Sequence, residues 1–167
     1  MSVVLFRVDE RLIHGQVVLG WGGQFKPDRY IVVDGELAVS EWEQELYRLA
    51  LPGGTLAEFW SPQLATEQVR SWQESDERTF VLVRSLAAAV ELASSGALQG
   101  ATLNLGGLHH APNRRELLPY LYLAEDDVER VRWLQASGVD VVAQDLPGSP
   151  RFDGETLISR GRSVWAS

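Results

Sequence analysis

The residues best suited to chemistry lie near the N-terminus, in a stretch spanning residues 7–17 that reads RVDERLIHGQV. An apolar strand precedes its polar part and an apolar helix follows it, which places two carboxylates, an arginine and a histidine in a strand-to-helix loop. Backbone N–H groups at a helix start favour anions. His14 can act as a nucleophile near neutral pH, and Arg11 can bind phosphate oxygens through two N–H groups. The loop therefore predicts a phosphoryl-binding site, or a histidine that merely completes a helix end.

Apolar patterns along the chain predict strands and helices in alternation. The expected strands cover residues 3–8, 29–34, 55–60, 78–83, 101–105, 120–123 and 139–143. Helices are expected over 14–25, 40–51, 86–95 and 125–136, with a further one starting at Ser61-Pro62. This alternation is typical of an α/β fold with a mostly parallel sheet.

Several helix details follow from particular residues. Gly22-Gly23 and Pro27 are expected to end the first helix. Ser40 is a candidate N-cap for the helix over 40–51, whose inner face is expected to carry Trp42, Leu46 and either Leu49 or Ala50. Residues 108–115 are expected to form a polar loop, and no regular structure is predicted after Pro147.

Ligands of parallel sheets bind beyond the carboxyl ends of the strands. That rule selects one edge of the sheet as the candidate site. Its members are Asp9 to Gly15, Asp34, Trp60-Ser61, Arg84-Ser85, Gly106-Gly107 and Asp145. Trp60 is the tryptophan best placed there to stack on a sugar.

Composition narrows the functional classes. The chain of 167 residues is expected to form a single domain over 1–167, and its 15 basic and 23 acidic residues argue against nucleic-acid binding. With no cysteine, disulfides and thiol chemistry are excluded. The absence of a long apolar run or a basic leader predicts a cytoplasmic location. Neither metal nor other cofactor is expected, because His109-His110 lacks the spacing of metal ligands.

The run Arg11-Leu12-Ile13-His14-Gly15-Gln16-Val17, preceded by Arg7-Val8-Asp9 and followed by Trp21, resembles a family signature. It is similar to that of the IIB component of the mannose/fructose/sorbose class of the sugar phosphotransferase system (PTS). The resemblance covers roughly residues 3–147 and leaves the tail, 148–167, uncertain. It implies a three-layer α/β/α fold of six to seven strands, with the first strand between the fourth and fifth.

The resemblance also implies a function. In that family the histidine of the motif, here His14, accepts a phosphoryl group on Nδ1 from a phosphohistidine of the IIA partner. It then passes the group to a sugar entering through the membrane components IIC and IID. The alternative is a regulatory phosphohistidine protein of an incomplete system, without sugar transport. A homodimer is compatible with either role.

The other candidate residues keep two interpretations each. Arg11 either clamps the phosphoryl group or pairs with Asp9 or Glu10. Asp9 either orients His14 or Arg11, or caps the loop. Gly15 allows close backbone approach, and Gln16 either donates to a phosphate or sugar oxygen or is simply exposed.

The remaining candidates lie on other strands of the same edge. Arg84 is either a second phosphate contact or a solvated residue at a strand end. The resemblance implies that Arg84 and the Gly106-Gly107 loop flank His14, and an ordinary turn is the alternative for the glycines. His109 or His110 is expected near the phosphoryl pocket, in contact with sugar or a partner.

Overall fold

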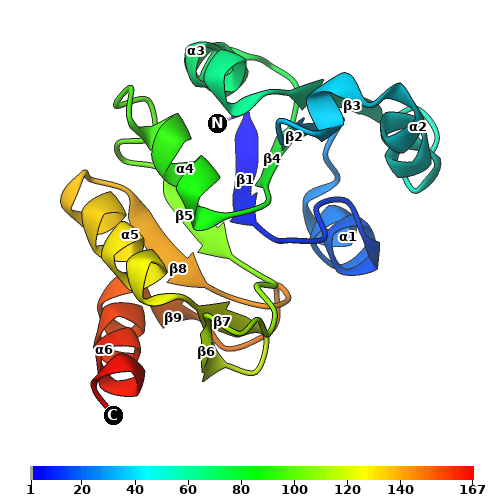
Figure 1. Ribbon diagram of the computed structural model, residues 1–167. Coiled ribbons are helices and arrows are strands. Elements are labelled where there is room, and N and C mark those ends of the chain that lie inside the picture. The colour runs from blue at the N-terminus through cyan, green and yellow to red at the C-terminus, as the bar shows by residue number, and fades with distance from the viewer. Residues whose placement is uncertain (1) are drawn as a thin grey trace.

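The computed structural model describes residues 2–167, which form a central sheet with helices on both faces (Figure 1). The strands are β1 (Val3–Val8), β2 (Arg29–Val33), β3 (Leu56–Trp60), β4 (Thr79–Val83), β5 (Thr102–Leu105), β6 (Arg115–Leu118), β7 (Leu121–Leu123), β8 (Asp140–Ala143) and β9 (Phe152–Asp153). The helices are the π-helix η1 (Gln16–Trp21), α1 (Gly22–Phe25), the 3-10 helix η2 (Leu37–Val39), α2 (Glu41–Leu49), α3 (Pro62–Glu74), α4 (Leu86–Ala93), α5 (Glu125–Ala136) and α6 (Gly154–Ala166).

The main sheet has β1 at its centre. Within residues 2–167 it contains seven strands in the order β3-β2-β4-β1-β5-β8-β9. Every pairing in it is parallel except that of β9 with β8. The three-layer α/β/α fold, the mostly parallel sheet and the position of β1 between β4 and β5 are therefore confirmed. Strands buried on both faces explain the near-continuous apolar runs of the sequence.

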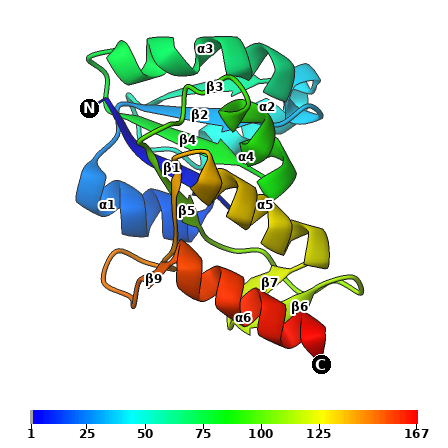
Figure 2. The ribbon, with the colours of Figure 1, turned by 90° about the vertical axis from the view of Figure 1, so that its left-hand side faces the viewer.

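Alternate strand residues supply two apolar cores, one on each face of the sheet. Val81 and Val83 belong to the core on the side of α3, α4, α5 and α6, whereas Phe80 and Leu82 belong to the core on the side of η1 and α2. Figures 1 and 2 show α3, α4, α5 and α6 side by side along one face of the sheet, with α1 on the other face. The period-2 alternation of strand side chains fixes this division.

The first predicted helix lies where the pattern placed it, but its glycines do not end it. Gly22 and Gly23 lie inside α1, and a Cβ at Gly22 would come within 2.7 Å of the Tyr30 hydroxyl oxygen. The helix ends instead at Lys26, whose φ of 48° is left-handed, directly before Pro27. Close packing, rather than chain termination, explains the glycine at position 22.

The expectation for the inner face of the second helix is wrong. Helix α2 follows Ser40, but Trp42, Leu46 and Leu49 are 68%, 57% and 81% exposed. The opposite side of the helix, with Tyr47, packs against Phe59. The apolar pattern of α2 therefore marks its outer surface, because in the part of the chain that the structure describes α2 lies at the outside of the molecule (Figure 1).

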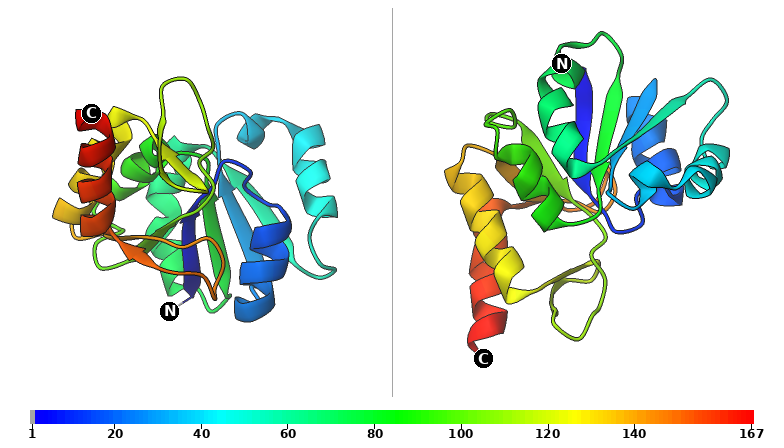
Figure 3. Two further views of the ribbon diagram at one scale, coloured as in Figure 1. Left: turned by 90° about the horizontal axis from the view of Figure 1, so that it is seen from below. Right: turned by 45° about the horizontal axis from the view of Figure 1, so that its top comes forward.

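The chain after Gly107 also differs from expectation. The predicted strand at 120–123 is present as β7, but it pairs antiparallel with β6 in a separate two-stranded sheet. The loop before β6 projects from the body of the molecule in both views of Figure 3. The tail, for which the sequence predicted no structure, forms β9 and the helix α6, which packs against α5.

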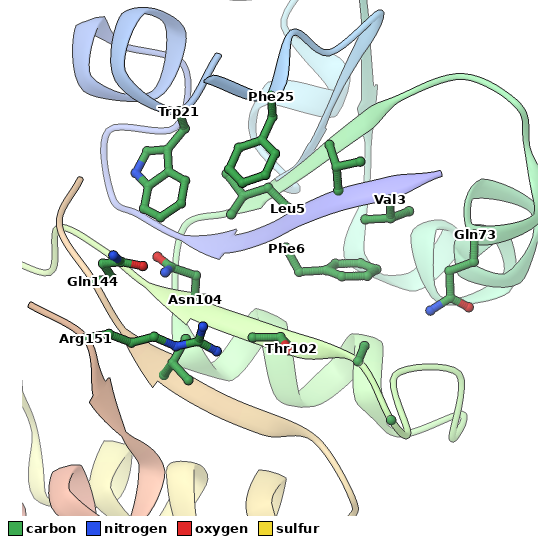
Figure 4. A pocket seen from close by; sticks show the side chains of 14 residues that line it. Val3, Leu5, Phe6, Trp21, Phe25, Gln73, Thr102, Asn104, Gln144 and Arg151 are labelled. Atoms are coloured by element: carbon green, nitrogen blue, oxygen red, sulfur yellow. The ribbon is translucent and has the colours of Figure 1, made fainter. Parts of the chain in front are cut away.

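A hollow of about 320 Å³ lies along β1 and β5, on the face of the sheet that carries α1 (Figure 4). Its apolar walls include Leu5, Trp21 and Phe25, and its polar side includes Asn104 and Arg151. None of residues 9–15 lines it. Among residues 2–167, no helix is long and apolar enough to cross a membrane.

Candidate active site at the carboxyl end of β1

The loop between β1 and η1 turns sharply at Leu12. This residue has a left-handed φ of 56° and a fully buried side chain. A left-handed backbone is uncommon for a bulky side chain and costs about 1 kcal/mol or more. The turn sends Leu12 and Ile13 into the core and leaves Arg11 at the surface, so the apolar residues of the motif anchor the polar ones.

Asp9 holds the ring of His14. The Asp9 side chain is fully buried, and its Oδ2 lies 3.1 Å from Nε2 of His14, a pairing distance without the geometry of a linear hydrogen bond. The Nε2 atom of His14 is buried. The Nδ1 atom is not fully buried and forms no hydrogen bond to any described residue. The carboxylate therefore faces one ring nitrogen and leaves the other available.

Three more groups surround the same carboxylate. The backbone N–H groups of Arg11 and Gly107 donate to Asp9 at 3.1 and 3.2 Å, and the guanidinium of Arg7 lies 3.3 Å away. Burial by itself would raise the pKa of Asp9, but the contacts with His14, the Arg11 amide and Arg7 outweigh it and hold this pKa well below its usual range. Asp9 is thus held as an anion. Its contact with the Arg11 amide caps the loop, and its approach to His14 fits an orienting role.

Arg7 is a site residue that the sequence analysis named only as part of the motif. Its side chain is fully buried in the middle of the sheet and donates to the Asn104 side chain and to the Gln144 and Asp145 carbonyls. The ring of Trp21 lies 5.3 Å from its guanidinium carbon. An arginine inside an otherwise apolar strand was the sequence signal for such a buried charge, because arginine is rarely buried without partners.

Gly106 and Gly107 line the site for different reasons. A Cβ at Gly106 would lie 2.2 Å from the Arg7 guanidinium, so only glycine fits beside the buried arginine. Gly107 donates its N–H to Asp9 and accepts from the N–H of Glu10. The loop therefore lies against Asp9 and the loop of His14, as the resemblance implied. A Cβ at Gly15, by contrast, would meet no atom of the described chain within 4 Å.

Arg11 forms the ion pair with Asp9 that was one of its two sequence interpretations. Its Nε lies 3.5 Å from Asp9, and its Nη2 donates to Oε1 of Gln16 at 2.9 Å. The side chain remains 41% exposed. The contact also turns Gln16 so that its carbonyl oxygen faces Arg11, which leaves the amide N–H groups of Gln16 for another acceptor.

Arg84, directly after β4, is held by groups other than His14. It pairs with Asp34 at 3.0 Å and donates to the carbonyl of Glu10 at 3.4 Å. Burial by itself would lower the pKa of Arg84, but the pairing with Asp34 outweighs it and raises this pKa. Within residues 2–167, no contact joins Arg84 to His14. Arg84 therefore supports the loop from behind.

The adjacent histidines after Gly107 diverge. His109 turns toward the site, with Nδ1 3.2 Å from Glu10, whereas His110 packs edge-on against Tyr122 with 5.8 Å between ring centroids. Glu10 also pairs with Arg114. In the described part of the chain, no group of three or more histidines and carboxylates is arranged to hold a metal ion.

Two hollows flank the histidine without enclosing it. One, of about 440 Å³, runs from Ile13 and Arg84 to Trp42 and Leu46 of α2, and the other, of about 300 Å³, contains Arg114. His14 lines neither of them.

The side chain of Trp60 packs beside Trp72 and not beside His14. Its ring packs edge-on against Trp72 with 6.0 Å between centroids, and its indole N–H donates to Glu58. The side chain contributes to the core under α3, so the sugar-stacking role considered from the sequence lacks structural support.

The fold and the rim together define an α/β protein with a histidine-carboxylate pair at the carboxyl edge of its central strand. The family model "PTS system sorbose subfamily IIB component" matches residues 3–166. The match extends past the region of 3–147 in which the resemblance was expected and includes β9 and α6. The chain therefore belongs to the sorbose-type IIB components of the PTS.

Individual relatives agree with this assignment. The sorbose-specific EIIB component of Klebsiella pneumoniae is 32% identical, covering 87% of this chain and 90% of its own. The N-acetylgalactosamine-specific IIB component 2 of Escherichia coli is 27% identical, with 91% and 96% covered. The crystal structure of the IIBSor domain of the Klebsiella pneumoniae sorbose permease superposes with a TM-score of 0.84 at 27% identity, covering 98% of each chain. IIB components of this family accept a phosphoryl group from IIA and pass it to sugar.

Proposed function

We propose that His14 is the residue of this IIB protein that carries the phosphoryl group, and that Nδ1 is the accepting atom. The observation that supports the proposal is the 3.1 Å approach of the buried Asp9 carboxylate to Nε2 of His14. A carboxylate at Nε2 favours the tautomer that has its proton there, and this tautomer leaves a lone pair on Nδ1. Asp9 is therefore a positioning residue for the nucleophile.

The transfer itself exchanges one P–N bond for another. The lone pair of His14 Nδ1 attacks phosphorus while the bond to the donor's imidazole breaks, and its electron pair remains on the donor ring. The Nε2 proton stays against Asp9, whose negative charge stabilises the positive charge that the phosphorylated ring acquires. Since the bond type is conserved, the protein mainly orients the two rings and stabilises charge.

Arg11 and Gln16 are the groups proposed to contact the phosphoryl oxygens. The guanidinium of Arg11 is half exposed and already aligned by Asp9 and Gln16. Charge-assisted N–H donors of this kind are the usual protein partners of phosphoryl groups. Gly15 leaves the approach to His14 open, since no described atom would contact a side chain there. Gly107 completes the site through its N–H to Asp9, and Gly106 does so by making room for Arg7.

The partners follow from the family. IIB components work with IIA and with the membrane components IIC and IID, which leaves the sugar to be bound by the membrane partners. The cytoplasm is the proposed place of action for a protein that exchanges phosphoryl groups with a IIA protein. Arg84 is proposed to act only by supporting the loop through Asp34.

A homodimer through the outer face of α2 is a further part of the proposal. The exposed side chains of Trp42, Leu46 and Leu49 lie on one helix, and apolar side chains gathered in this way commonly mark protein contacts. Light scattering of the purified chain and of a Leu46→Glu variant would test it. A monomeric wild type would exclude the dimer without affecting the role of His14.

The direct test of the proposed function is labelling. A cognate or surrogate IIA protein is phosphorylated from phosphoenolpyruvate and mixed with wild type, His14→Ala and His110→Ala. Acid-labile, base-stable label is expected on wild type and His110→Ala and absent from His14→Ala. Label that persists on His14→Ala would contradict the proposal and move the chemistry to another histidine.

A further inference from the structure

His109 lies beside Arg11 at the open side of the site. A Cβ at Gly107 would be 3.1 Å from Nη2 of Arg11 and also 3.1 Å from Nε2 of His109. The two nitrogens, Nη2 of Arg11 and Nε2 of His109, are therefore no more than about 6 Å apart, and both lie beside Gly107. Two donors at such a separation can each lie about 2.8 Å from different oxygens of one phosphoryl group.

The same glycine connects His109 to His14. The N–H of Gly107 donates to Oδ2 of Asp9 at 3.2 Å, and this oxygen is the one that lies 3.1 Å from His14. Arg11 contacts the other oxygen of the same Asp9 carboxylate. His14 and His109 are thus connected through Asp9 and Gly107, with Arg11 in contact with Asp9 and beside Gly107.

Glu10 fixes the ring of His109 in this position. One oxygen of Glu10 accepts from the His109 backbone N–H and contacts its Nδ1, each at 3.2 Å, while the other pairs with Arg114. The carboxylate thereby occupies Nδ1 and leaves Nε2 directed toward Arg11 and Gly107. With Nδ1–H facing Glu10, donation from Nε2 requires the doubly protonated ring. A phosphoryl dianion brought against Nε2 would form an ion pair with that cation.

We propose that His109 is a second phosphoryl-binding residue, which donates Nε2–H to the phosphoryl group as the group reaches His14. This inference rests on the proposed role of His14. His109 forms no bond to phosphorus; it balances negative charge on an oxygen of the transferring group together with Arg11. Glu10 acts through His109 as a positioning residue.

The neighbouring His110 provides a matched control. Both histidines are exposed and adjacent in the chain, but the ring of His110 packs on Tyr122 and has no contact with Glu10, Arg11 or Gly107 among the described residues. A substitution at either position changes composition and surface charge equally. Only the substitution at position 109 should alter the phosphoryl site.

The test compares His109→Phe, His109→Arg and His110→Phe with wild type. Phosphoryl transfer from phospho-IIA, followed by quenched flow, is expected to be about 10- to 100-fold slower in His109→Phe, the scale of losing one charge-stabilising donor. His109→Arg should recover much of the rate by restoring a cation, and His110→Phe should remain within about twofold of wild type. The ³¹P resonance of phospho-His14 should move in His109→Phe and stay in place in His110→Phe.

The outcomes separate this inference from the function on which it rests. If wild type takes no label on His14, the proposed function and the inference both fail. If wild type is labelled and His109→Phe matches it in rate and ³¹P resonance, only the inference is overturned. A slower rate with an unchanged resonance would also overturn it, because His109 would then merely tether its loop to Glu10. Urea unfolding of each variant checks that the fold is retained.

Discussion

The guanidinium of Arg7 lies 3.3 Å from the carboxylate of Asp9, and both side chains are fully buried. This pair connects the centre of the sheet to the reactive rim, because Asp9 also contacts His14. A buried ion pair adds little net stability by itself, but removing one partner leaves the other uncompensated. The pair therefore makes the geometry of the site depend on the core.

Arg7→Met tests this dependence. Loss of the guanidinium leaves Asp9 without its buried counter-ion and is expected to lower the free energy of unfolding by about 3–5 kcal/mol. Arg132→Met is the control, because Arg132 pairs with Glu129 one helical turn away and both side chains are 59% exposed. That variant should change stability by less than about 0.5 kcal/mol. Equal urea midpoints for both variants would contradict the role assigned to Arg7.

Asp9→Asn probes the tautomer of His14. The amide preserves size but can present an N–H to Nε2, which favours the wrong tautomer and places the ring proton on Nδ1. Phosphoryl transfer from phospho-IIA should slow by about 10²-fold or more, as expected when a nucleophile loses its orienting carboxylate. Rates are measured at saturating donor so that partner binding is not limiting. A rate within threefold of wild type would show that Asp9 acts only as a loop cap.

The depressed pKa of Asp9 predicts how stability depends on pH. A carboxyl whose pKa is lower in the folded state stabilises the fold fully above its unfolded value of about 3.9, and loses that contribution as pH falls toward the folded pKa. The free energy of unfolding in urea should therefore decline from about pH 5 to pH 3. Asp9→Asn should show a shallower decline, although it starts from lower stability. Parallel curves would assign the acid sensitivity to other carboxyls, Glu10 among them.

Much of the fold could be predicted because its signals are local. Apolar strands, turn glycines such as Gly138 and the acidic first turn of α5 each follow from a few neighbouring residues. The strand order and the role of His14 came instead from resemblance, since no local pattern specifies which strands pair. The strand at β7 was predicted, but β6 and its pairing with β7 were missed, because the first two residues of β6 are the charged Arg115 and Glu116 and the segment was assigned to a polar loop.

The site was predictable in composition but not in contacts. The motif put Asp9, Arg11 and His14 in one loop, yet nothing in it showed that Arg84 would turn to Asp34 or that His109 would turn to Glu10. Both pairings join segments more than 45 residues apart, as their positions in the chain show. The buried face of α2 was assigned wrongly for a related reason. A period of 3.6 identifies an apolar face of a helix but does not show whether another element covers that face.

Gly106→Ala and Gly15→Ala distinguish structural from functional glycines. The methyl group at position 106 would collide with the immobile guanidinium of Arg7, so this variant should lose about 2 kcal/mol or more and transfer phosphoryl poorly. At position 15 the methyl group meets no protein atom and the backbone is right-handed helical, so stability should be unchanged or slightly higher. A slower transfer by Gly15→Ala with unchanged stability would show that the partner or phosphoryl group approaches there. Thermal unfolding and labelling rates give both quantities, and a destabilised Gly15→Ala would contradict this reading of the loop.

Trp42→Ala and Trp72→Ala test the outward orientation of α2 in the same way. Trp42 is 68% exposed, so its truncation removes little buried surface and should change the free energy of unfolding by less than about 1 kcal/mol. Trp72 is 2% exposed and packs against Trp60, so its loss should cost about 3–5 kcal/mol. The fluorescence of the two variants provides a second check, because removal of Trp42 should eliminate a solvent-exposed, red-shifted component and removal of Trp72 a buried one. Comparable destabilisation by the two substitutions at low protein concentration would mean that α2 packs its tryptophan inward, as its sequence pattern alone predicts.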